Sequence, residues 1–351
     1  MRALFVGLGG IGQRHLRNLR ALRGAEVEVV AWRSRGLART ISAKLEVEPG
    51  EEVEKKYGVR SFATLEHALA TRPDVAFICN PSSLHVGPAI AAAKAGCHLF
   101  LEKPLSNSLA GLDDLRRAAT EKRIKVLIGY QLRFHPLLRR IRALLDARAV
   151  GNVVSVRAEV GEYLPGFHPY EDYRQMYAAT RALGGGVALS QIHELDYLYW
   201  LFGLPRRIFA LGGHLSNLEI DVEDVASALL ECVGPKGAFP VHLQQDYIQR
   251  PPSRTCIVVG DSGKIVLDLR EPSLRVFNEQ GALSEETILT KFDRNQLFMD
   301  ELRHFLDCAE GRAAPVVNLE DGIASLRMAL GVLQSMESGQ VVELDSLGGA
   351  T

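Results

Sequence analysis

The chain is short of cysteine and of long apolar runs. Its five cysteines are scattered over 351 residues without the C-x-x-C spacing that a zinc site or a disulfide framework would show. No stretch approaches the ~20 apolar residues that a membrane-spanning helix needs, and Met1 leads straight into a predicted strand without a signal peptide. These absences predict a cytoplasmic protein without a metal site or a membrane segment.

An excess of charge of either sign is also missing. Lys and Arg together number 41 and Asp and Glu 42, which gives a formal net charge of -1. This balance gives no support for binding to nucleic acid or to an anionic membrane surface. With 351 residues the chain exceeds the usual size of one domain, so we expect two.

What the chain does have is a glycine-rich turn at its start. Leu4–Val6 is a short apolar run typical of a buried strand, and G-x-G-x-x-G follows it, ahead of a predicted helix. Gly7 permits a tight turn, Gly9 lets a pyrophosphate approach the backbone, and Gly12 lets helix and strand pack closely. The pattern predicts dinucleotide binding, although a βα turn that binds nothing can share it. The residues expected at the phosphates are Gly7, Gly9, Gly10, Ile11 and Gly12.

Strands and helices alternate up to about residue 130. Such alternation predicts parallel strands joined by right-handed crossovers. The charged stretch between Gly36 and Arg60 is expected to form a partial helix with a surface turn. The expected strands are Val27–Arg33, Val75–Cys79, His98–Leu101 and Lys125–Gly129, and the expected helices are Glu66–Ala70, Leu84–Ala95 and Ser108–Lys122.

After Gly129 the pattern changes. A helix is predicted at His135–Ala147, and strand-like segments then follow one another with short turns, which indicates a largely antiparallel sheet. We therefore expect an α/β protein with a dinucleotide-binding domain over 1–130 and a second α/β domain over 131–351, whose last helices can pack back on the first domain. The segments of the second domain are strands at Val153–Val160, Arg207–Gly212, Val225–Glu231, Gly237–Gln245, Thr255–Val259 and Lys264–Asp268, then helices at Asn295–Glu310 and Glu320–Ser338.

The second predicted strand ends with Arg33, followed by Ser34 and Arg35. NAD enzymes usually place Asp or Glu here to bind the ribose hydroxyls, and that charge is unfavourable beside the extra phosphate of NADP. Two guanidinium groups and a hydroxyl suit a phosphate better than a bare ribose. We therefore expect NADP(H) in preference to NAD(H), with the alternative that both arginines simply project into solvent.

Polar turns follow two further apolar strands, in "ICNPSSLH" and "FLEKPLS". In an open parallel sheet, ligands bind at the carboxyl ends of the strands, so these turns are expected near the nicotinamide end of the cofactor. Desolvation or a neighbouring charge can tune the ammonium group of Lys103 at such a place, although an isolated lysine is more often solvated surface and His85 could be structural. The residues concerned are Asn80, Pro81, Ser82, His85, Glu102 and Lys103.

Together these segments carry a resemblance that covers essentially the whole chain. The glycine turn, "NPSSLH", "EKPLS", "GYQLRFHP" at Gly129–Pro136 and "GGGVALSQIHELDYLYWLFG" at Gly184–Gly203 resemble, in this order, the Gfo/Idh/MocA family of nicotinamide-dependent sugar and polyol oxidoreductases. The resemblance implies an N-terminal Rossmann domain and a C-terminal α/β domain whose open sheet supports substrate binding and often dimerisation. It also implies that Lys103 and His193 line the reaction centre, Lys103 polarising the reacting oxygen and His193 serving as an acid/base group.

The chain departs from the family pattern at two places. The asparagine of the usual T-P-N-x-x-H turn is replaced by Ser82, which can still hydrogen-bond a cofactor amide. The aspartate that commonly stands four residues before the histidine is absent, and Ser190 stands three residues before His193 instead. The carboxylate is therefore missing or supplied from elsewhere, with Glu194 and Asp196 as candidates.

The segment "GEYLPGFHPYEDYRQMYAATRALGGG", Gly161–Gly186, is the expected substrate loop. Its aromatic faces can stack on sugar rings, its polar groups can bind hydroxyls, and its arginines suit a carboxylate or phosphate; an ordinary surface loop is the alternative. Arg133 is expected either in the site or in a structural ion pair. The residues expected to bind substrate are Arg133, Tyr163, His168, Tyr170, Arg174 and His193.

The sequence thus predicts an NAD(P)-dependent oxidoreductase that moves a hydride between nicotinamide and a hydroxyl or carbonyl carbon of a sugar, sugar acid or polyol. The resemblance further implies a homodimer or higher homo-oligomer, and "GQRHLRNL" with "HPYEDYR" resembles members associated with bacterial cell-surface sugars. Two alternatives stay open. One is a non-redox lyase or glycosidase that oxidises and re-reduces its sugar within one cycle, and the other is a catalytically idle NADPH-binding sensor.

Overall fold

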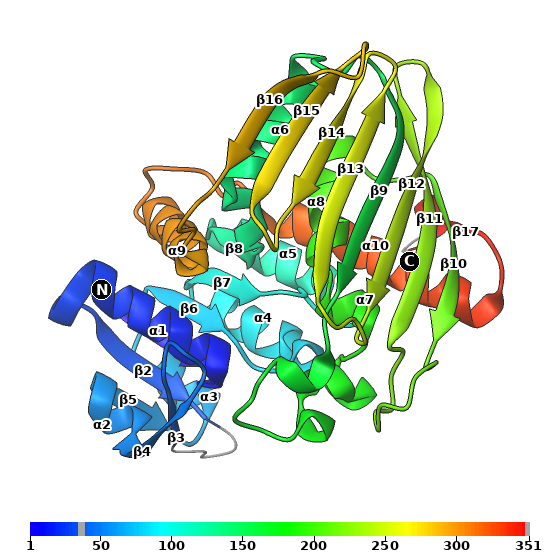
Figure 1. Cartoon of the computed structure of the whole chain (residues 1–351). Helices are drawn as coiled ribbons and strands as arrows, with labels where there is room; N and C mark the ends of the chain where they lie inside the picture. Colours follow the sequence, from blue (N-terminus) through cyan, green and yellow to red (C-terminus); the bar gives the residue numbers. More distant parts are fainter. Residues whose placement is uncertain (34–38, 348–351) are drawn as a thin grey trace. The chain divides into compact units, whose positions relative to one another are not determined.

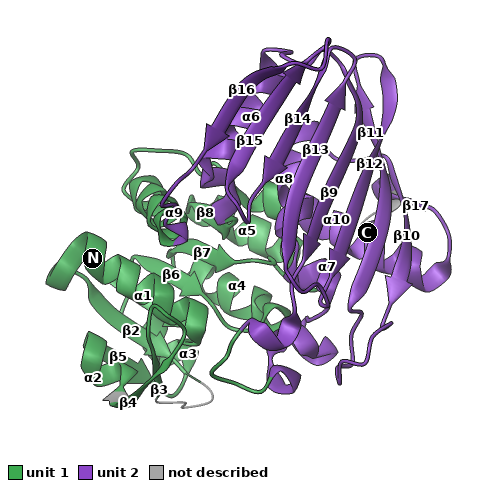
Figure 2. Ribbon diagram, in the orientation of Figure 1, with its two compact units in different colours: residues 1–130, 168–172, 295–323 green, residues 131–167, 173–294, 324–351 purple. Residues whose placement is uncertain are grey.

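The computed structural model describes residues 1–33 and 39–347 (Figure 1). Ser34 and Arg35, two of the expected cofactor residues, lie outside the described residues. None of the described helices is long and apolar enough to cross a membrane. The chain forms two compact units (Figure 2): unit 1 contains Met1–Tyr130, His168–Asp172 and Asn295–Ile323, and unit 2 contains Gln131–Phe167, Tyr173–Arg294 and the chain from Ala324 onward.

Unit 1 is built on a six-stranded sheet in the order β5-β2-β1-β6-β7-β8, and every neighbouring pair is parallel. The two strands β6 and β7 are buried along almost their whole length, as expected for a sheet covered on both faces. The predicted parallel sheet is confirmed. Its strands are β1 (Arg2–Val6), β2 (Glu28–Trp32), β5 (Val59–Phe62), β6 (Val75–Ile78), β7 (His98–Glu102) and β8 (Val126–Gly129).

Helices from both ends of the sequence pack in unit 1. The Phe305 ring of α9 makes edge contacts with Phe77 on β6 and Phe100 on β7, at centroid distances of 5.6 and 5.5 Å. Leu302 and Leu306, on the same face of α9, join this core. The helices are α1 (Gly10–Arg23), α2 (Val53–Tyr57), α3 (Leu65–Leu69), α4 (Val86–Lys94), α5 (Leu112–Lys122), α9 (Arg294–Ala309) and the first turn of α10 (Leu319–Ser338).

The charged stretch between Gly36 and Arg60 differs from its prediction. Only α2 corresponds to the expected partial helix. Before it, β3 (Arg39–Ile41) and β4 (Val47–Glu52) form an antiparallel pair, and after it β5 pairs with β2. Charged residues hide the alternation that marks a strand, and the pairing of β5 is made with a strand far back in the sequence.

Unit 2 is built on a nine-stranded sheet in the order β16-β15-β14-β13-β9-β12-β11-β10-β17. Only β9 and β12 pair in parallel, so the predicted, largely antiparallel sheet is confirmed. Strands β15, β16 and β17 were not predicted; β16 and β17 are the two edge strands, and β16 is polar and mostly exposed. The strands are β9 (Val153–Gly161), β10 (Arg207–Gly213), β11 (Val225–Gly234), β12 (Gly237–Asp246), β13 (Ser253–Gly260), β14 (Gly263–Asp268), β15 (Ser273–Asn278), β16 (Leu283–Ile288) and β17 (Val342–Glu343).

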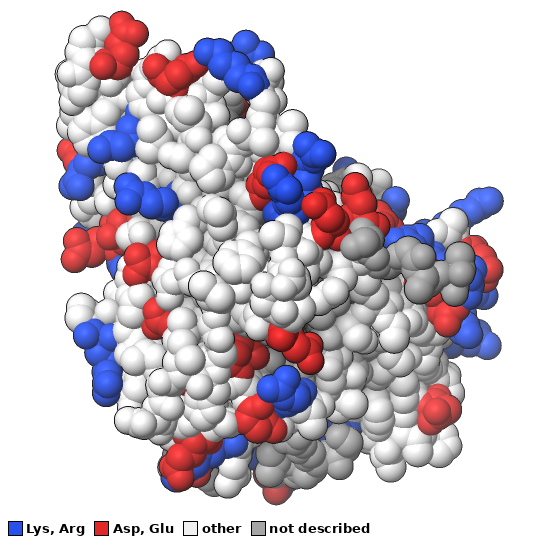
Figure 3. Space-filling model, turned by 90° about the vertical axis from the view of Figure 1, so that its right-hand side faces the viewer, with Lys and Arg blue, Asp and Glu red and all other residues white. Residues whose placement is uncertain are grey.

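One face of this sheet is covered by helices of unit 2, and side chains on its other face are exposed (Figure 1). The covering helices are α6 (Pro136–Asp146), α8 (His193–Phe202) and the part of α10 from Ala324. Within α8, Leu195 and Leu198 are buried and Trp200 is half-buried. On the face of the molecule drawn in Figure 3, Lys and Arg are interspersed with Asp and Glu, and a broad area carries neither.

Candidate active site

The glycine turn lies between β1 and α1 and is tightly packed. Gly7 has a φ of 91°, and a Cβ at this residue would lie 2.8 Å from the backbone nitrogen of Asn80. A Cβ on Gly12 would lie 2.4 Å from the Gly7 carbonyl oxygen, so α1 packs directly against the turn. Gly9 is exposed and has open space where its Cβ would stand. Gly9 therefore offers the open backbone position that an approaching pyrophosphate requires.

The N-terminus of α1 suits an anion. Among the described residues, no side chain caps the helix, and its first turn contains neither Asp nor Glu. The first N–H groups of a helix have no partner within it, and the helix dipole places partial positive charge there. The turn and the helix start together fit the diphosphate of a dinucleotide.

Arg33, just after β2, is engaged by a carboxylate. Its guanidinium pairs with Glu54 of α2, and its side chain is 9% exposed. The Ser61 hydroxyl donates a hydrogen bond of 3.1 Å to the same carboxylate. A ribose phosphate bound here would therefore have to share Arg33 with Glu54 or replace Glu54 as its partner.

The turn after β6 is held together by its own polar groups. Asn80 Nδ2 donates to the Leu84 carbonyl at 2.8 Å, and His85 Nε2 lies 2.7 Å from the Asn80 carbonyl oxygen. Ser82 and His85 are both buried, and burial lowers the pKa of His85. The His85 ring is therefore neutral near pH 7 and donates a hydrogen bond to the Asn80 carbonyl. This bond holds the Asn80–Pro81 end of the turn against the start of α4.

Glu102 ends β7 and anchors the backbone of Lys103. Glu102 Oε1 lies 2.6 Å from His15 Nε2 on α1, and Oε2 accepts the Lys103 N–H at 3.1 Å. Burial by itself raises the pKa of Glu102, but the hydrogen bond and charge of His15 and the charge of Lys103 outweigh it and leave the pKa below its usual value. The half-buried Lys103 is thus positioned beside a fixed carboxylate.

His15 was not singled out in the sequence. It is completely buried and tilts against the Phe100 ring at a centroid distance of 4.6 Å. A signal was present, because His15 lies four residues after Ile11 and four before Leu19, on the face of α1 that the helical period turns toward the sheet.

In unit 2, Gly184–Gly186 leads into the short helix α7 (Val187–Ser190). The carboxylate of Glu223 packs against this turn. Gly186 has a φ of 104°, and a Cβ there would lie 2.1 Å from Glu223 Oε1. The same oxygen accepts the Ala188 N–H at 3.2 Å, and burial raises the pKa of Glu223 to about 6. This contact could not be predicted from local sequence patterns, because Ala188 and Glu223 lie 35 positions apart in the chain.

His193 begins α8 and is buried. Its Nε2 lies 3.2 Å from the side-chain nitrogen of Gln131. Gln131 stands within the "GYQLRFHP" motif but was not among the expected site residues.

The two candidate replacements for the missing aspartate are both held by arginines. Glu194 forms two hydrogen bonds with Arg254, of 2.7 and 2.9 Å, and Asp196 forms two of 2.8 Å with Arg133. Glu194, Asp196 and Arg133 are buried. Of the two roles expected for Arg133, the described contacts are those of an ion pair.

The residues expected to bind substrate are divided between the units. Tyr163 and Arg174 lie in unit 2, where Arg250 stacks 4.0 Å above the Tyr163 ring and Arg174 pairs with Glu219 at 2.7 Å. His168 and Tyr170 lie in unit 1, where the Tyr170 hydroxyl lies against Gly10 of the glycine turn. The segment Gly161–Gly186, which was expected to act as one substrate loop, is therefore divided between the two units.

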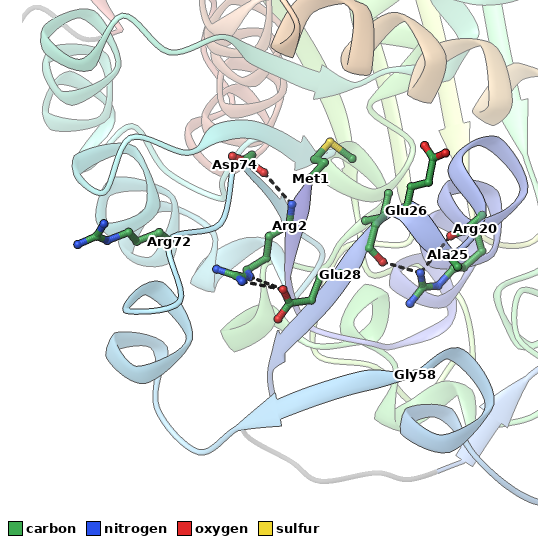
Figure 4. Close-up of a pocket in the computed structure, with 11 residues that line it drawn as sticks. Met1, Arg2, Arg20, Ala25, Glu26, Glu28, Gly58, Arg72 and Asp74 are labelled. Carbon is green, nitrogen blue, oxygen red and sulfur yellow. Dashed lines mark hydrogen bonds and ion pairs between the residues drawn. The ribbon is translucent and has the colours of Figure 1, made fainter.

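Unit 1 also has a depression of about 900 Å³ at the amino ends of β1 and β2 (Figure 4). Two of its arginines are engaged: Arg2 pairs with Glu28 at 2.7 Å, and Arg20 donates to the Val27 carbonyl at 2.6 Å. Because the glycine turn and Lys103 follow the carboxyl ends of the strands, this depression lies at the other edge of the sheet. It is separate from the candidate active site.

Comparison with known proteins agrees with this geometry. Residues 1–130 match a family model described as an oxidoreductase family with an NAD-binding Rossmann fold, and residues 138–266 match the GFO/IDH/MocA C-terminal domain. The chain is 25% identical to a myo-inositol 2-dehydrogenase of Thermotoga maritima, over 99% of this chain and 100% of that protein. It is 30% identical to an uncharacterised oxidoreductase of Synechocystis, over 74% of this chain and 72% of the relative.

A solved structure has the same fold over the whole chain. It is the WlbA dehydrogenase from Bordetella pertussis in complex with NADH and UDP-GlcNAcA, with a TM-score of 0.78 and 21% identity. The match covers 98% of each chain.

Proposed function

Because the chain belongs to the GFO/IDH/MocA family of nicotinamide-dependent oxidoreductases, we propose that it transfers a hydride between NADP(H) and a hydroxyl or carbonyl carbon of a sugar, sugar acid or polyol. The inositol dehydrogenase among its relatives acts on a compound of this class.

One observation in unit 1 supports the proposal most strongly. The open glycine turn follows β1, the Asn80 turn follows β6 and Lys103 follows β7, and these three strands are adjacent and parallel in the sheet. Their carboxyl ends therefore form one edge, where dinucleotides bind in open α/β sheets. A phosphate site and a half-buried ammonium group at the same edge suit a redox reaction at the far end of a dinucleotide.

The bound nicotinamide supplies the group that accepts or gives the hydride. We assign to Lys103 a hydrogen bond to the reacting oxygen, where its ammonium group stabilises the negative charge that forms as the hydroxyl proton leaves in oxidation or as the hydride adds to the carbonyl carbon in reduction. We assign to His193 the hydroxyl proton, which it accepts when an alcohol is oxidised and returns when a carbonyl is reduced. Tyr163 and Arg174 are proposed to contact the substrate.

The preference for NADP(H) is tested at Arg33. We expect Arg33→Ala to raise the dissociation constant of NADPH about tenfold or more, since a charge-assisted bond to a phosphate is lost, and to change that of NADH much less. Titration of the intrinsic fluorescence measures both constants. Arg60→Ala, which removes an exposed arginine on β5, is the matched control. Equal losses for the two cofactors in the Arg33 variant would contradict the preference.

The reaction itself is tested by a turnover screen. The purified protein is offered NADP⁺ and NAD⁺ with free polyols, aldoses, sugar acids and nucleotide-linked sugars, and the reduced cofactor and the product masses are followed together. A dehydrogenase produces NADPH in proportion to product. Product without net cofactor change would indicate the transient-redox alternative, and tight NADPH binding without turnover across the panel would favour a sensor. A nucleotide-linked or acidic sugar as substrate would support a role in cell-surface sugar metabolism.

We also propose that the protein is a homodimer through the exposed face of the unit 2 sheet. Phe209 on β10 lies directly opposite Leu229 on β11, and with Leu211 and Val233 these side chains expose an apolar surface. An exposed patch of this kind commonly marks an interface. Sedimentation should give twice the chain mass, and Leu229→Glu should give a monomer because it places a charge in the interface. A wild-type monomer at micromolar concentration would contradict the proposal.

The compartment proposed for this enzyme is the cytoplasm. All five cysteines are buried, free thiols. Thiols of this kind persist in a reducing compartment.

A further inference from the structure

The segment His168–Asp172 belongs to unit 1, although the chain on both sides of it belongs to unit 2. Within this segment, Tyr170 lies on the first residue of α1. Its hydroxyl oxygen is 2.5 Å from the position that a Cβ of Gly10 would occupy, whereas the ring carbon bearing the hydroxyl is 3.6 Å away. The Tyr170 hydroxyl thus takes the space of a side chain at position 10, inside the glycine turn.

Charged side chains of both signs surround Tyr170. The Arg39 guanidinium lies 5.4 Å from the centroid of the Tyr170 ring and donates at 3.4 Å to both the Tyr170 carbonyl and Glu171 Oε2. The His168 ring stacks on Tyr170 at a centroid distance of 5.1 Å, and its Nδ1 lies 2.7 Å from Glu171 Oε1. The phenol therefore contacts both a histidine and an arginine, and its hydroxyl lies at the N-terminus of α1.

The hydroxyl is a hydrogen-bond donor at neutral pH. Burial raises the pKa of Tyr170 to about 12, helped by Glu171 and opposed by Arg39 and Arg14. A neutral phenol can donate to an anion, and the two arginines add positive potential at the same place. A phosphate is the ligand chemistry that a donor, two guanidinium groups and free helix N–H groups suit together.

We propose that Tyr170 binds a phosphate of the dinucleotide through its hydroxyl, with Arg39 held beside it as a second phosphate contact. The inference rests on the proposed function, because it requires a dinucleotide in the glycine turn. It assigns to the middle of the expected substrate loop a role in cofactor binding. Gly10 is then glycine because the Tyr170 hydroxyl occupies the position of its side chain.

The test compares four proteins: wild type, Tyr170→Phe, Gly10→Ala and the double variant. Their dissociation constants for NADPH and for ADP-ribose, which has the diphosphate but no nicotinamide, are measured by calorimetry. We expect Tyr170→Phe to weaken both ligands about tenfold, since a bond to a charged group is lost. Tyr173→Phe is the matched control, because its hydroxyl contacts the Glu219 nitrogen in unit 2.

Gly10→Ala tests whether Tyr170 affects ligand binding through its contact at Gly10 or from a distance. The added methyl group meets the Tyr170 hydroxyl in the wild-type background, so we expect weaker binding of both ligands. In the Tyr170→Phe background the nearest ring carbon is at an ordinary contact distance, so Gly10→Ala should add no further loss. Thermal melting of all four proteins checks that each is folded.

The outcomes distinguish this inference from the proposed function. A wild type that binds neither NADPH nor NADH would overturn the proposed function itself. If the wild type binds NADPH, and Tyr170→Phe binds NADPH and ADP-ribose as tightly as the wild type does, only the assignment of Tyr170 is wrong. An unchanged cofactor constant with a raised KM for the sugar would restore Tyr170 to substrate binding and would also overturn the inference.

Discussion

Replacing Lys103 with alanine is expected to lower kcat by about 10²–10⁴-fold, the usual contribution of a positioned proton-transfer or polarising group. The dissociation constant of NADPH should hardly change, because the proposed phosphate site is the glycine turn. The fold should also be retained: Glu102 keeps its bond to His15 and continues to accept the backbone N–H of residue 103. Steady-state kinetics and NADPH titration on the same preparation measure the two effects.

The control for this variant is Lys94→Ala, which removes an exposed lysine in the last turn of α4. Its kcat should equal that of the wild type. If Lys103→Ala turned over as fast as Lys94→Ala, the ammonium group would have no part in the reaction. A loss of NADPH affinity as large as the loss of kcat would assign Lys103 to cofactor binding instead.

The second large effect is expected on stability. Asp196→Ala removes both hydrogen bonds that the buried Arg133 makes with this carboxylate. Deleting one partner of a buried ion pair typically costs about 3–5 kcal/mol, because the remaining charge stays in a poorly solvated place. The shift of the urea unfolding midpoint measures the loss.

Asp300→Ala is the matched control, since Asp300 pairs with Arg303 at the surface of α9. It should change the free energy of unfolding by less than about 1 kcal/mol. Equal midpoints for the two variants would contradict a stabilising role of the Arg133–Asp196 pair. If Asp196→Ala were stable but raised the KM of the sugar, Arg133 would be a substrate ligand.

Local sequence patterns predicted the three turns of unit 1, which are the glycine turn and the turns after β6 and β7. The glycine turn is a strand, three glycines and a helix in immediate succession, so residue spacing alone indicates its conformation. The turns after β6 and β7 could be placed at one edge because parallel strands present all their carboxyl ends together. The parallel and antiparallel sheets follow from the same reasoning on connection lengths.

Contacts between distant parts of the chain could not be predicted in this way. Arg133 and Asp196 are 63 positions apart, and nothing in the order of residues indicates that the candidate carboxylate already has an arginine. The division of Gly161–Gly186 between two units is of the same kind, because it depends on Tyr170 fitting against Gly10. Such pairings arise from the packed fold and leave no periodic signal in the sequence.

The central claim, hydride transfer to a sugar-like substrate, is tested most directly by isotope transfer. The carbonyl form of a substrate identified in the screen is incubated with the protein and NADPH that carries deuterium at the transferring carbon, and the product is analysed by mass spectrometry. We predict deuterium at the new carbinol carbon, with one NADPH oxidised for each product formed. Product that forms without deuterium and without oxidation of NADPH would contradict the account.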